Sequence, residues 1–320
     1  MTKVLDTVLL LALPASGKSE VRKYLALQTP EKCRDDFGLG ETVQLDDFPY
    51  VHLMRRVDDE LAALGKERIF FQAPDRGFRE GRDWGTLIAL INEDREALDV
   101  PTPPRTKGAG ETIMMRLEQA AMKVGIPPRL SKLDGAARAA VSKQLEKEAR
   151  ELLEGLVAAR PASLEGKTII IEAARGGAEG STMPLAAPFG YLYSLSLLSP
   201  KILERASILY IWVTPEESRR KNLARTDPND PGSILHHGVP EAVMRGDYGC
   251  DDMGWLIEQS DKPNTVRLEA HGRTYRLPVA RFDNRVDRTS FVRDDAKSWK
   301  PEDVKALHEG LREAFALLKR

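Results

Sequence analysis

The feature that most constrains this chain is an apolar run that leads directly into a loop containing glycine and lysine. Residues 8–13 read Val-Leu-Leu-Leu-Ala-Leu, and residues 14–19 continue as Pro-Ala-Ser-Gly-Lys-Ser. The apolar run is typical of a buried strand, and Val21 and Leu25 then begin a stripe with the i,i+4 spacing of a helix. The sequence therefore predicts a strand, a tight loop and a helix at the start of the chain.

The loop matches the Walker pattern of Gly, four residues, Gly-Lys-Ser/Thr, except that Ala12 replaces the first glycine. In such loops, backbone N–H groups surround phosphate oxygens, the lysine reaches the outer phosphates and the hydroxyl residue holds Mg²⁺. The positive end of the following helix dipole favours the same anion. We therefore expect Lys18 to bind a polyphosphate and Ser19 its metal, within a binding segment made of Pro14, Ala15, Ser16, Gly17, Lys18 and Ser19.

Charge and cysteine content narrow the class of protein. The 320 residues include 48 Lys and Arg against 49 Asp and Glu, and the net charge of −1 offers no overall attraction to nucleic acid or membranes. Cys33 and Cys250 are too few for a disulfide framework and suit a reducing compartment. No apolar stretch approaches a membrane span, and the N-terminal run is no signal peptide because it enters the loop. We expect a cytoplasmic protein without disulfide partners or membrane contact.

Strand-like runs recur along the chain and are separated mainly by helical patterns, which favours an α/β fold with a mostly parallel, five-stranded sheet. The runs are residues 8–13, 42–45, 168–171, 208–213 and 275–282. More than 120 residues separate the second run from the third, far more than an ordinary crossover needs. Apolar positions in that segment have helical spacing. We therefore expect a core of residues 1–49 and 161–320, with a helical insertion at 50–160 over the carboxyl edge of the sheet.

Local signals predict several helix ends and loops. Thr214-Pro-Glu-Glu217 is a capping box with proline at the first helical position, so a helix is expected just after the fourth strand. Pro301, Glu302 and Asp303 begin the final helix. Two stretches rich in turn-forming residues, 101–110 and 227–233, are expected to be a loop and a series of turns.

Carboxylates follow two of the predicted strands. The second run ends in Leu45-Asp46-Asp47-Phe48, and the third ends in Glu172. Ligands of open α/β sheets bind beyond the carboxyl ends of the strands, so these side chains fall at the expected site. Asp46 or Asp47 could accept the proton of an attacking hydroxyl or bind Mg²⁺ through water, although both could instead cap the next helix. Glu172 suits the position of a Walker B acid that helps to hold Mg²⁺.

Arginines supply candidate ligands for phosphate groups. Arg175 lies in Ala-Arg-Gly-Gly after the third strand, where a guanidinium could bind a substrate phosphate. Arg220 and Arg225, on a helix with Arg219 and Lys221, could neutralise the charge on a transferred phosphoryl group, or could simply form a solvated face. Arg55 is a weaker candidate substrate ligand than these, because it follows the aspartate pair on what reads as a surface helix.

One further cluster is tempting as a metal site. His236 and His237 are followed, after a short loop-rich stretch, by Cys250, Asp251 and Asp252. The spacing fits no established zinc pattern, so we do not expect metal ligation there.

Taken together, these motifs resemble the P-loop kinases of the nucleoside and nucleotide kinase group, including the kinase domains of polynucleotide kinases. Residues 13–19 are similar to their phosphate loop, and residues 45–48 to the Asp-Asp-Phe or Asp-Ser-Phe that closes the second strand of uridine kinase-like enzymes. Residues 210–220 with Arg225 resemble their fourth strand and arginine-bearing helix. The resemblance covers residues 4–49 and 167–226 and implies a three-layer P-loop NTPase fold with strand order 2-3-1-4-5. It also implies ATP and Mg²⁺ as requirements and the first aspartate as base.

The leading hypothesis is an ATP-dependent kinase that phosphorylates a hydroxyl or phosphate of a nucleoside, a nucleotide or a polynucleotide end. A sugar or another small alcohol suits the same residues. Two hypotheses from other classes are a nucleotide-dependent switch or ATPase that binds a partner through the helical insertion, and an inactive nucleotide-binding scaffold. The residues do not choose between Asp46 and Asp47 as base, and they do not identify the acceptor.

Overall fold

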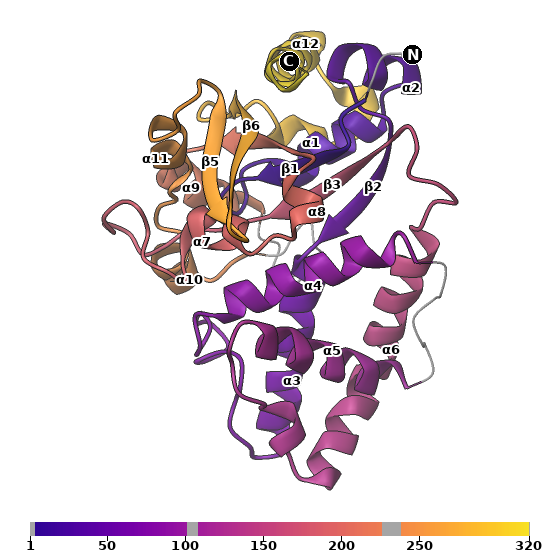
Figure 1. The fold of residues 1–320 in the computed structure, drawn as a ribbon, viewed down its shortest axis with the longest axis vertical. Coiled ribbons are helices and arrows are strands. Elements are labelled where there is room, and N and C mark those ends of the chain that lie inside the picture. The colour runs from indigo at the N-terminus through magenta and orange to yellow at the C-terminus, as the bar shows by residue number, and fades with distance from the viewer. Residues whose placement is uncertain (1–3, 101–107, 226–237, 320) are drawn as a thin grey trace.

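A computed structural model describes residues 4–100, 108–225 and 238–319 of the chain. These residues form one sheet flanked by helices (Figure 1). The sheet has six strands in the order β2-β3-β1-β4-β6-β5. Their bounds are Thr7–Leu11 for β1, Glu41–Asp46 for β2, Lys167–Ala173 for β3, Ala206–Trp212 for β4, Thr265–Ala270 for β5 and Arg273–Asp283 for β6. The expected α/β class and the mostly parallel sheet are confirmed.

The prediction of five strands is wrong by one, because β5 was not anticipated. The pairs β2–β3, β3–β1, β1–β4 and β4–β6 are parallel, whereas β5 pairs antiparallel with β6. His271 and Gly272 connect β5 to β6, and both have positive φ angles, of 51° and 71°. Two such residues form the tight turn that suits the twist of a hairpin. Residues 265–270 also alternate between buried and exposed, as an edge strand does.

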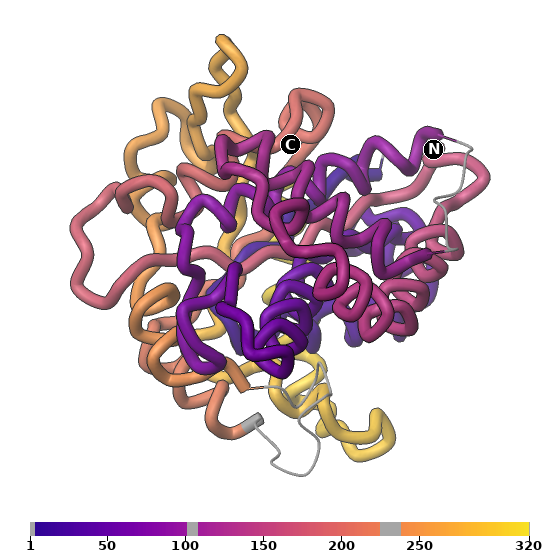
Figure 2. The backbone as a smooth tube through the Cα atoms, turned by 90° about the horizontal axis from the view of Figure 1, so that it is seen from below, coloured from indigo at the N-terminus to yellow at the C-terminus, as the bar shows by residue number. Residues whose placement is uncertain are grey.

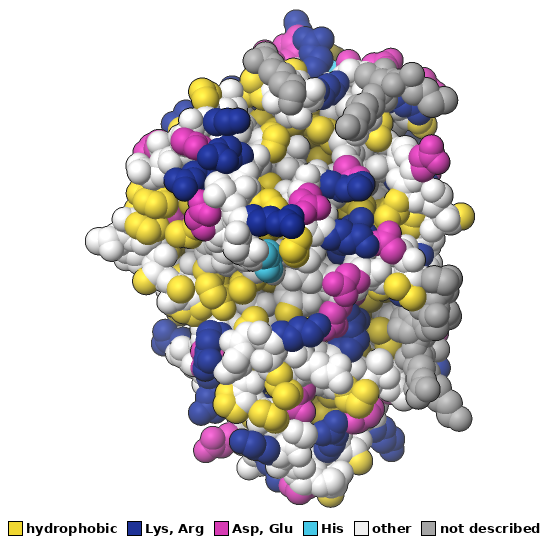
Figure 3. Space-filling model, in the orientation of Figure 1, with side chains coloured by type: hydrophobic (Ala, Val, Ile, Leu, Met, Phe, Trp, Pro, Cys, Tyr) yellow, Lys and Arg dark blue, Asp and Glu magenta, His cyan; other side chains and the backbone are white. Residues whose placement is uncertain are grey.

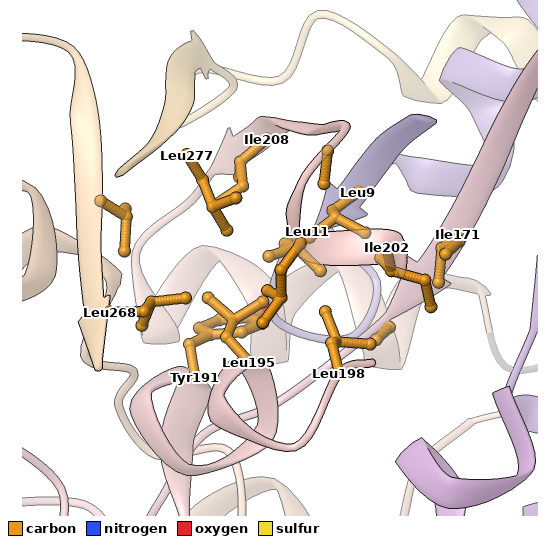
Figure 4. Packing of buried hydrophobic residues seen from close by; sticks show 14 of the residues in the cluster. Leu9, Leu11, Ile171, Tyr191, Leu195, Leu198, Ile202, Ile208, Leu268 and Leu277 are labelled. Atoms are coloured by element: carbon orange, nitrogen blue, oxygen red, sulfur yellow. The ribbon is translucent and has the colours of Figure 1, made fainter. Parts of the chain in front are cut away.

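Helices cover both faces of the sheet because successive strand residues point to opposite sides. One face packs Leu9, Ile171 and Ile208 against α7 (Gly190–Ser196), α8 (Pro200–Leu203) and α11 (Met253–Glu258), and Figure 4 shows the strand and helix side chains pointing toward one another. The other face packs Leu10 and Ile170 against α1 (Lys18–Ala26) and α12 (Pro301–Leu318). The short elements α2 (Pro30–Lys32) and η1 (Cys33–Phe37) lie beside α12.

The predicted insertion is helical, and its helices gather at the end of the molecule opposite α12 (Figures 1 and 2). They are α3 (Phe48–Ala63), α4 (Asp83–Ala97), α5 (Ala109–Lys123) and α6 (Gly135–Ala158), with the short η2 (Leu130–Lys132) before α6. Residues from all four helices share a separate apolar cluster that includes Leu53, Leu90, Leu117 and Leu145. Ile88 and Ile91 of α4 instead join the core beneath the sheet, so the insertion packs directly on the sheet domain.

The ends of the remaining helices agree with the sequence at α9 and α12 and differ from it at α5. Helix α9 (Pro215–Arg225) begins as predicted, and the Thr214 hydroxyl accepts a hydrogen bond from the N–H of Glu217 at 3.2 Å. Helix α12 begins at Pro301. The predicted loop at 101–110 is wrong at its end, because α5 already begins at Ala109, and residues 101–107 lie outside the described residues. The predicted turns at 227–233 also lie outside them. The other elements are α10 (Glu241–Gly246), η3 (Ser290–Arg293) and η4 (Ala296–Ser298).

The surface carries both signs of charge. In the view of Figure 3, basic and acidic side chains alternate across the face and do not gather into one large patch of a single sign. Cys33 and Cys250 are both free thiols. Within the described ranges, no helix is both long enough and apolar enough to cross a bilayer.

Candidate functional site

The loop between β1 and α1, residues 12–17, has a backbone that demands glycine at its end. We call it the N-terminal loop. Gly17 has a φ of +102°, and a Cβ atom there would lie 2.4 Å from Oγ1 of Thr289 and 2.9 Å from Nδ2 of Asn284. Ala15 also has a positive φ, of 55°. L-residues rarely adopt such angles except at tightly constrained loops, so this loop is a specifically shaped element.

Hydrogen bonds from two distant residues and one local residue hold the N-terminal loop. Asn284 donates from Nδ2 to the Ser16 carbonyl at 2.8 Å and to Thr289 Oγ1 at 2.9 Å. Ser218 donates its hydroxyl to the Pro14 carbonyl at 2.7 Å, and Ser16 donates its own to the Leu13 carbonyl at 2.5 Å. Sequence reasoning missed Asn284, Thr289 and Ser218, although Asn284 follows the last predicted strand directly.

Lys18 lies folded over the loop that precedes it. Its Nζ is 3.4 Å from the carbonyl oxygens of Ala12 and Leu13, and the side chain is largely buried. Ser19, the next residue, is half-buried in the first turn of α1. Both residues line the cavity described below, as do the loop residues Pro14, Ala15, Ser16 and Gly17.

A single cavity brings most of the predicted site residues together. Besides the N-terminal loop, it is lined by Asp46, Asp47, Arg55, Glu172 and Arg175. It lies between the carboxyl ends of β1, β2 and β3 and the helical insertion, because its far side is made by α3, α4 and the segment after α10. The sheet edge and the insertion therefore enclose one site.

Asp46 and Glu172 form a carboxylate pair across two neighbouring strands. They are direct partners in the β2–β3 register, and Arg22 of α1 contacts both, at 2.7 Å from Glu172 and 3.6 Å from Asp46. Burial raises the pKa of Asp46 to about 7, helped by the charges of Glu172 and Asp47; the Phe48 N–H, which donates to Asp46 at 2.9 Å, and Arg22 oppose the shift. A carboxyl with such a pKa can exchange a proton near neutral pH. Arg22 is a site residue that sequence reasoning missed.

Asp47 and Arg175 form a second, separate pair. Their side chains are 9% and 3% exposed, and Oδ2 of Asp47 lies 2.6 Å from Nη1 of Arg175. Arg175 also donates from Nε to the Ser194 hydroxyl of α7 at 3.0 Å and from Nη1 to the Ala174 carbonyl at 2.7 Å. Its Nη2 is buried without a hydrogen-bond partner among the described residues. The two adjacent aspartates thus have different partners. Asp46 lies beside Arg22 of α1, whereas Asp47 pairs with Arg175 in the segment between β3 and α7.

The opposite side of the cavity is aromatic. Phe71, Phe78, Trp84 and Tyr248 follow one another in contact, and we call them the aromatic wall. Phe71 stacks on Phe78 at 4.6 Å between ring centroids, Phe78 meets Trp84 edge-on at 4.9 Å, and Trp84 meets Tyr248 edge-on at 5.6 Å. Arg55 lies over Phe71 at 4.0 Å and Arg175 over Trp84 at 5.1 Å, so guanidinium groups lie over two of the four rings of the wall.

Arg55 and Asp247 add polar groups beside the aromatic wall. Arg55, predicted from a weak signal, lines the cavity and donates to the Pro74 carbonyl at 2.9 Å. Asp247 is half-buried; burial raises its pKa to about 6, and the charge of Arg55 opposes that shift. Its Oδ2 lies so close to Gly77 that a Cβ atom on that glycine would be 2.3 Å away. No sequence pattern indicated Asp247.

Arg220 of α9 does not line the cavity. Arg220 is exposed and pairs with Glu217 at 2.7 Å and with Asp287 at 3.5 Å. Lys221 is buried and pairs with Asp287 at 2.9 Å, next to Thr289 behind the N-terminal loop. Arg225 ends the helix, and its side chain lies outside the described part of the chain. The predicted role of Arg220 and Arg225 at a phosphoryl group stays a prediction.

The residues of the cavity suit a triphosphate with Mg²⁺. The positive-φ loop at a helix N-terminus, with Lys18 beside it, offers backbone and side-chain donors to phosphate oxygens. Ser19, Asp46 and Glu172 offer the hard oxygen ligands that Mg²⁺ prefers, and this ion typically takes only one or two carboxylates together with phosphates and water.

The two aspartates of the histidine, cysteine and aspartate cluster, Asp251 and Asp252, hydrogen-bond to other parts of the fold. Asp251 accepts a hydrogen bond from the Tyr210 hydroxyl at 2.8 Å, and Asp252 accepts from the N–H groups of Tyr191 and Leu192 at the start of α7. His236 and His237 lie outside the described residues. Among the residues that are described, no group of three or more His, Cys, Asp or Glu side chains is arranged to hold a metal.

Comparison of the chain with protein-family models, with curated proteins and with solved structures finds no match. The functional assignment therefore depends on the geometry of the cavity alone.

Proposed function

We propose that the protein is an ATP-dependent kinase that transfers the γ-phosphate to a hydroxyl or phosphate of a nucleoside, a nucleotide or a polynucleotide end. One observation carries this proposal: the N-terminal loop with Lys18 and the carboxylates of two neighbouring strands line the same cavity, opposite a wall suited to an organic acceptor. Phosphoryl transfer needs positioning, charge neutralisation and a group that takes the acceptor proton. Each need has a residue in this cavity.

The donor end of the cavity is the N-terminal loop. Its N–H groups and Lys18 bind and orient the phosphates of ATP, and Ser19 and Glu172 would hold Mg²⁺. When bound, this ion neutralises charge on the phosphate oxygens. Asn284 and Ser218 keep the loop in its binding shape, because they hydrogen-bond its carbonyl oxygens.

Asp46 is the base of the proposed reaction. Its pKa of about 7 lets the carboxylate accept the proton of the acceptor hydroxyl at neutral pH. The acceptor oxygen then forms a bond to the γ-phosphorus while the bond to the bridging oxygen of ADP breaks, and the proton stays on Asp46. Asp47 is less suited to this role, since its carboxylate is buried against Arg175.

The remaining cationic residues serve the acceptor and the transferred group. Arg175 and Arg55 flank the aromatic wall, where they orient the acceptor and exclude water. Helix α9 already contacts the N-terminal loop through Ser218, so for Arg220 to reach the phosphoryl group its side chain would have to leave Glu217.

The test is phosphoryl transfer from [γ-³²P]ATP to a panel of nucleosides, nucleotides, 5′-hydroxyl oligonucleotides and sugars, with Mg²⁺ present. The proposal predicts a labelled acceptor and its loss in Lys18→Ala. ATP hydrolysis without any labelled acceptor, combined with partner binding that responds to nucleotide, would instead favour the switch hypothesis.

A further inference from the structure

We propose that the aromatic side of the cavity is a subsite for the nucleobase of a nucleoside acceptor, in which Asp247 accepts an N–H of the base and Nη2 of Arg175 donates to a ring nitrogen or carbonyl oxygen. This inference deepens the proposed function and rests on it only for the identity of the reaction, because binding to the subsite can be measured without phosphoryl transfer.

The shape of the subsite favours a flat ring. Four aromatic side chains follow one another along one side of the cavity, and three of them, Phe71, Phe78 and Trp84, are almost fully buried. Such rings offer broad apolar faces and edges to a planar ligand. The wall is also held in place: the buried carboxylate of Asp58 accepts hydrogen bonds from the N–H groups of Ile69, Phe70 and Phe71 at 2.7–3.2 Å.

Two polar groups of the subsite lack hydrogen-bond partners in the described residues, and one is a donor while the other is an acceptor. Nη2 of Arg175, whose side chain is 3% exposed, is a buried donor without an acceptor among the described residues. Asp247 has a carboxylate that lines the cavity, and within the described ranges its side chain makes no hydrogen bond or ion pair. An unpaired buried donor costs stability, so a ligand that accepts a hydrogen bond from Nη2 of Arg175 gains affinity, and the half-buried carboxylate of Asp247 can accept a ligand N–H. Both residues line the same cavity, and a nucleobase carries donors and acceptors that can meet groups of both kinds.

The charges argue against a polynucleotide end as the primary acceptor. The charge of Arg175 is neutralised by Asp47 at 2.6 Å. The positive charge of Arg55 acts on the carboxylate of Asp247 and opposes the rise of its pKa. The subsite therefore carries both signs in balance, whereas a channel for a nucleic-acid backbone carries a positive excess. A single base fits the balanced site better.

The ligand side of the test uses chemically paired probes. Uridine, cytidine, adenosine and guanosine are titrated against the protein with a non-hydrolysable ATP analogue and Mg²⁺, and each is paired with a derivative methylated on its donor nitrogen, such as 3-methyluridine for uridine. At least one nucleoside should bind, and its methylated partner should bind about 10- to 100-fold more weakly, as expected for loss of a hydrogen bond to a charged group. Ribose serves as the acceptor without a nucleobase.

The protein side of the test is Asp247→Asn, with Asp75→Asn as the matched control. Asp75 lies in the α3–α4 connection, which also carries Phe71 and Phe78 of the wall, but its side chain is 67% exposed. The proposal predicts that Asp247→Asn reduces the difference between the bound nucleoside and its methylated partner to less than about threefold, and that Asp75→Asn preserves it. Binding is followed by calorimetry and by the fluorescence of Trp84, with Trp84→Phe identifying the signal.

The outcomes separate this proposal from the kinase proposal. Nucleoside binding with the predicted methylation effect, but without transfer, supports the subsite and overturns the kinase. The subsite is overturned if none of the four nucleosides binds, if ribose binds as tightly as the nucleosides, or if methylation has no effect. Because the methylated probes act on the unaltered protein, this conclusion stands even if Asp247→Asn fails to fold.

Discussion

The two ends of the cavity are built in opposite ways. The N-terminal loop is one continuous segment whose shape is set by Gly17 and by hydrogen bonds to its own carbonyl oxygens. The aromatic wall takes its residues from the α3–α4 connection, from α4 and from the segment after α10, which lie more than 160 residues apart along the chain. A continuous loop can be read from a sequence pattern, whereas a wall of this kind exists only after folding.

The largest effect is expected at the continuous end. Lys18→Ala should lower phosphoryl transfer by about 10³-fold, because a charge that neutralises the transferred group is lost from a water-poor site. The fold should survive, because the change removes the side chain beyond Cβ and leaves the backbone of the N-terminal loop and its hydrogen bonds to Asn284 and Ser218 in place. Turnover with ATP and the thermal unfolding midpoint measure the two effects.

Lys23→Ala is the matched control, because Lys23 lies on the same helix, does not line the cavity and donates to the carbonyl oxygens of Arg293 and Asp294. Equal turnover in Lys18→Ala and Lys23→Ala would break the assignment of the N-terminal loop as the donor end.

The next largest effect separates two adjacent carboxylates. Asp46→Asn should lower transfer by about 10²-fold through loss of the base, with no loss of stability, because burial already disfavours the ionised form of Asp46. Asp47→Asn should instead lower the free energy of unfolding by about 3 kcal/mol, since it leaves the buried Arg175 charge uncompensated. Urea unfolding and single-turnover kinetics are compared for both variants. The reverse pattern would make Asp47 the base.

A pair of glycine substitutions tests the shape of the N-terminal loop. Gly17→Ala should destabilise the protein by about 2 kcal/mol or more, because a positive φ and a Cβ contact of 2.4 Å with Thr289 both oppose it. Gly155→Ala, in the exposed interior of α6 with no atom within 4 Å of the added Cβ, should stabilise it by about 0.5–1 kcal/mol. Chemical denaturation measures both. A Gly17→Ala variant as stable as the wild type would show that the loop relaxes freely.

The smallest expected effect is on the pH profile. Asp46 must be ionised to accept a proton, and its pKa is raised to about 7, so kcat/KM should rise with pH and level off above that value. At one pH unit below the midpoint, the rate should be about tenfold lower than the plateau. Arg22→Gln should move the midpoint to higher pH, because the charge of Arg22 favours the ionised carboxylate. A flat profile between pH 5 and 8 would contradict the role of Asp46.

Sequence patterns predicted the parts of the molecule that depend on neighbouring residues. The buried run before Gly17, the capping box at Thr214 and the start of α12 at Pro301 all follow from local chemistry, and the structure confirms them. The same holds for the mostly parallel sheet, because long apolar runs separated by helical patterns require crossovers.

Other parts depend on contacts between distant residues. Arg22 lies on the polar side of an ordinary helix, and only the β2–β3 register shows that it faces Asp46 and Glu172 together. Asp247 sits in no motif and gains its importance from burial beside Gly77 and Arg55. The extra strand β5 was missed for a different reason: its six residues alternate in polarity, so they form no apolar run.

Helix α3 connects the two ends of the cavity mechanically. Asp47 lies at its N-terminus, and Asp58, some 11 residues and about 16 Å further along the axis, holds the loop that carries Phe71. One continuous helix therefore sets the spacing between the strand end that carries Asp46 and Asp47 and the loop that carries Phe71.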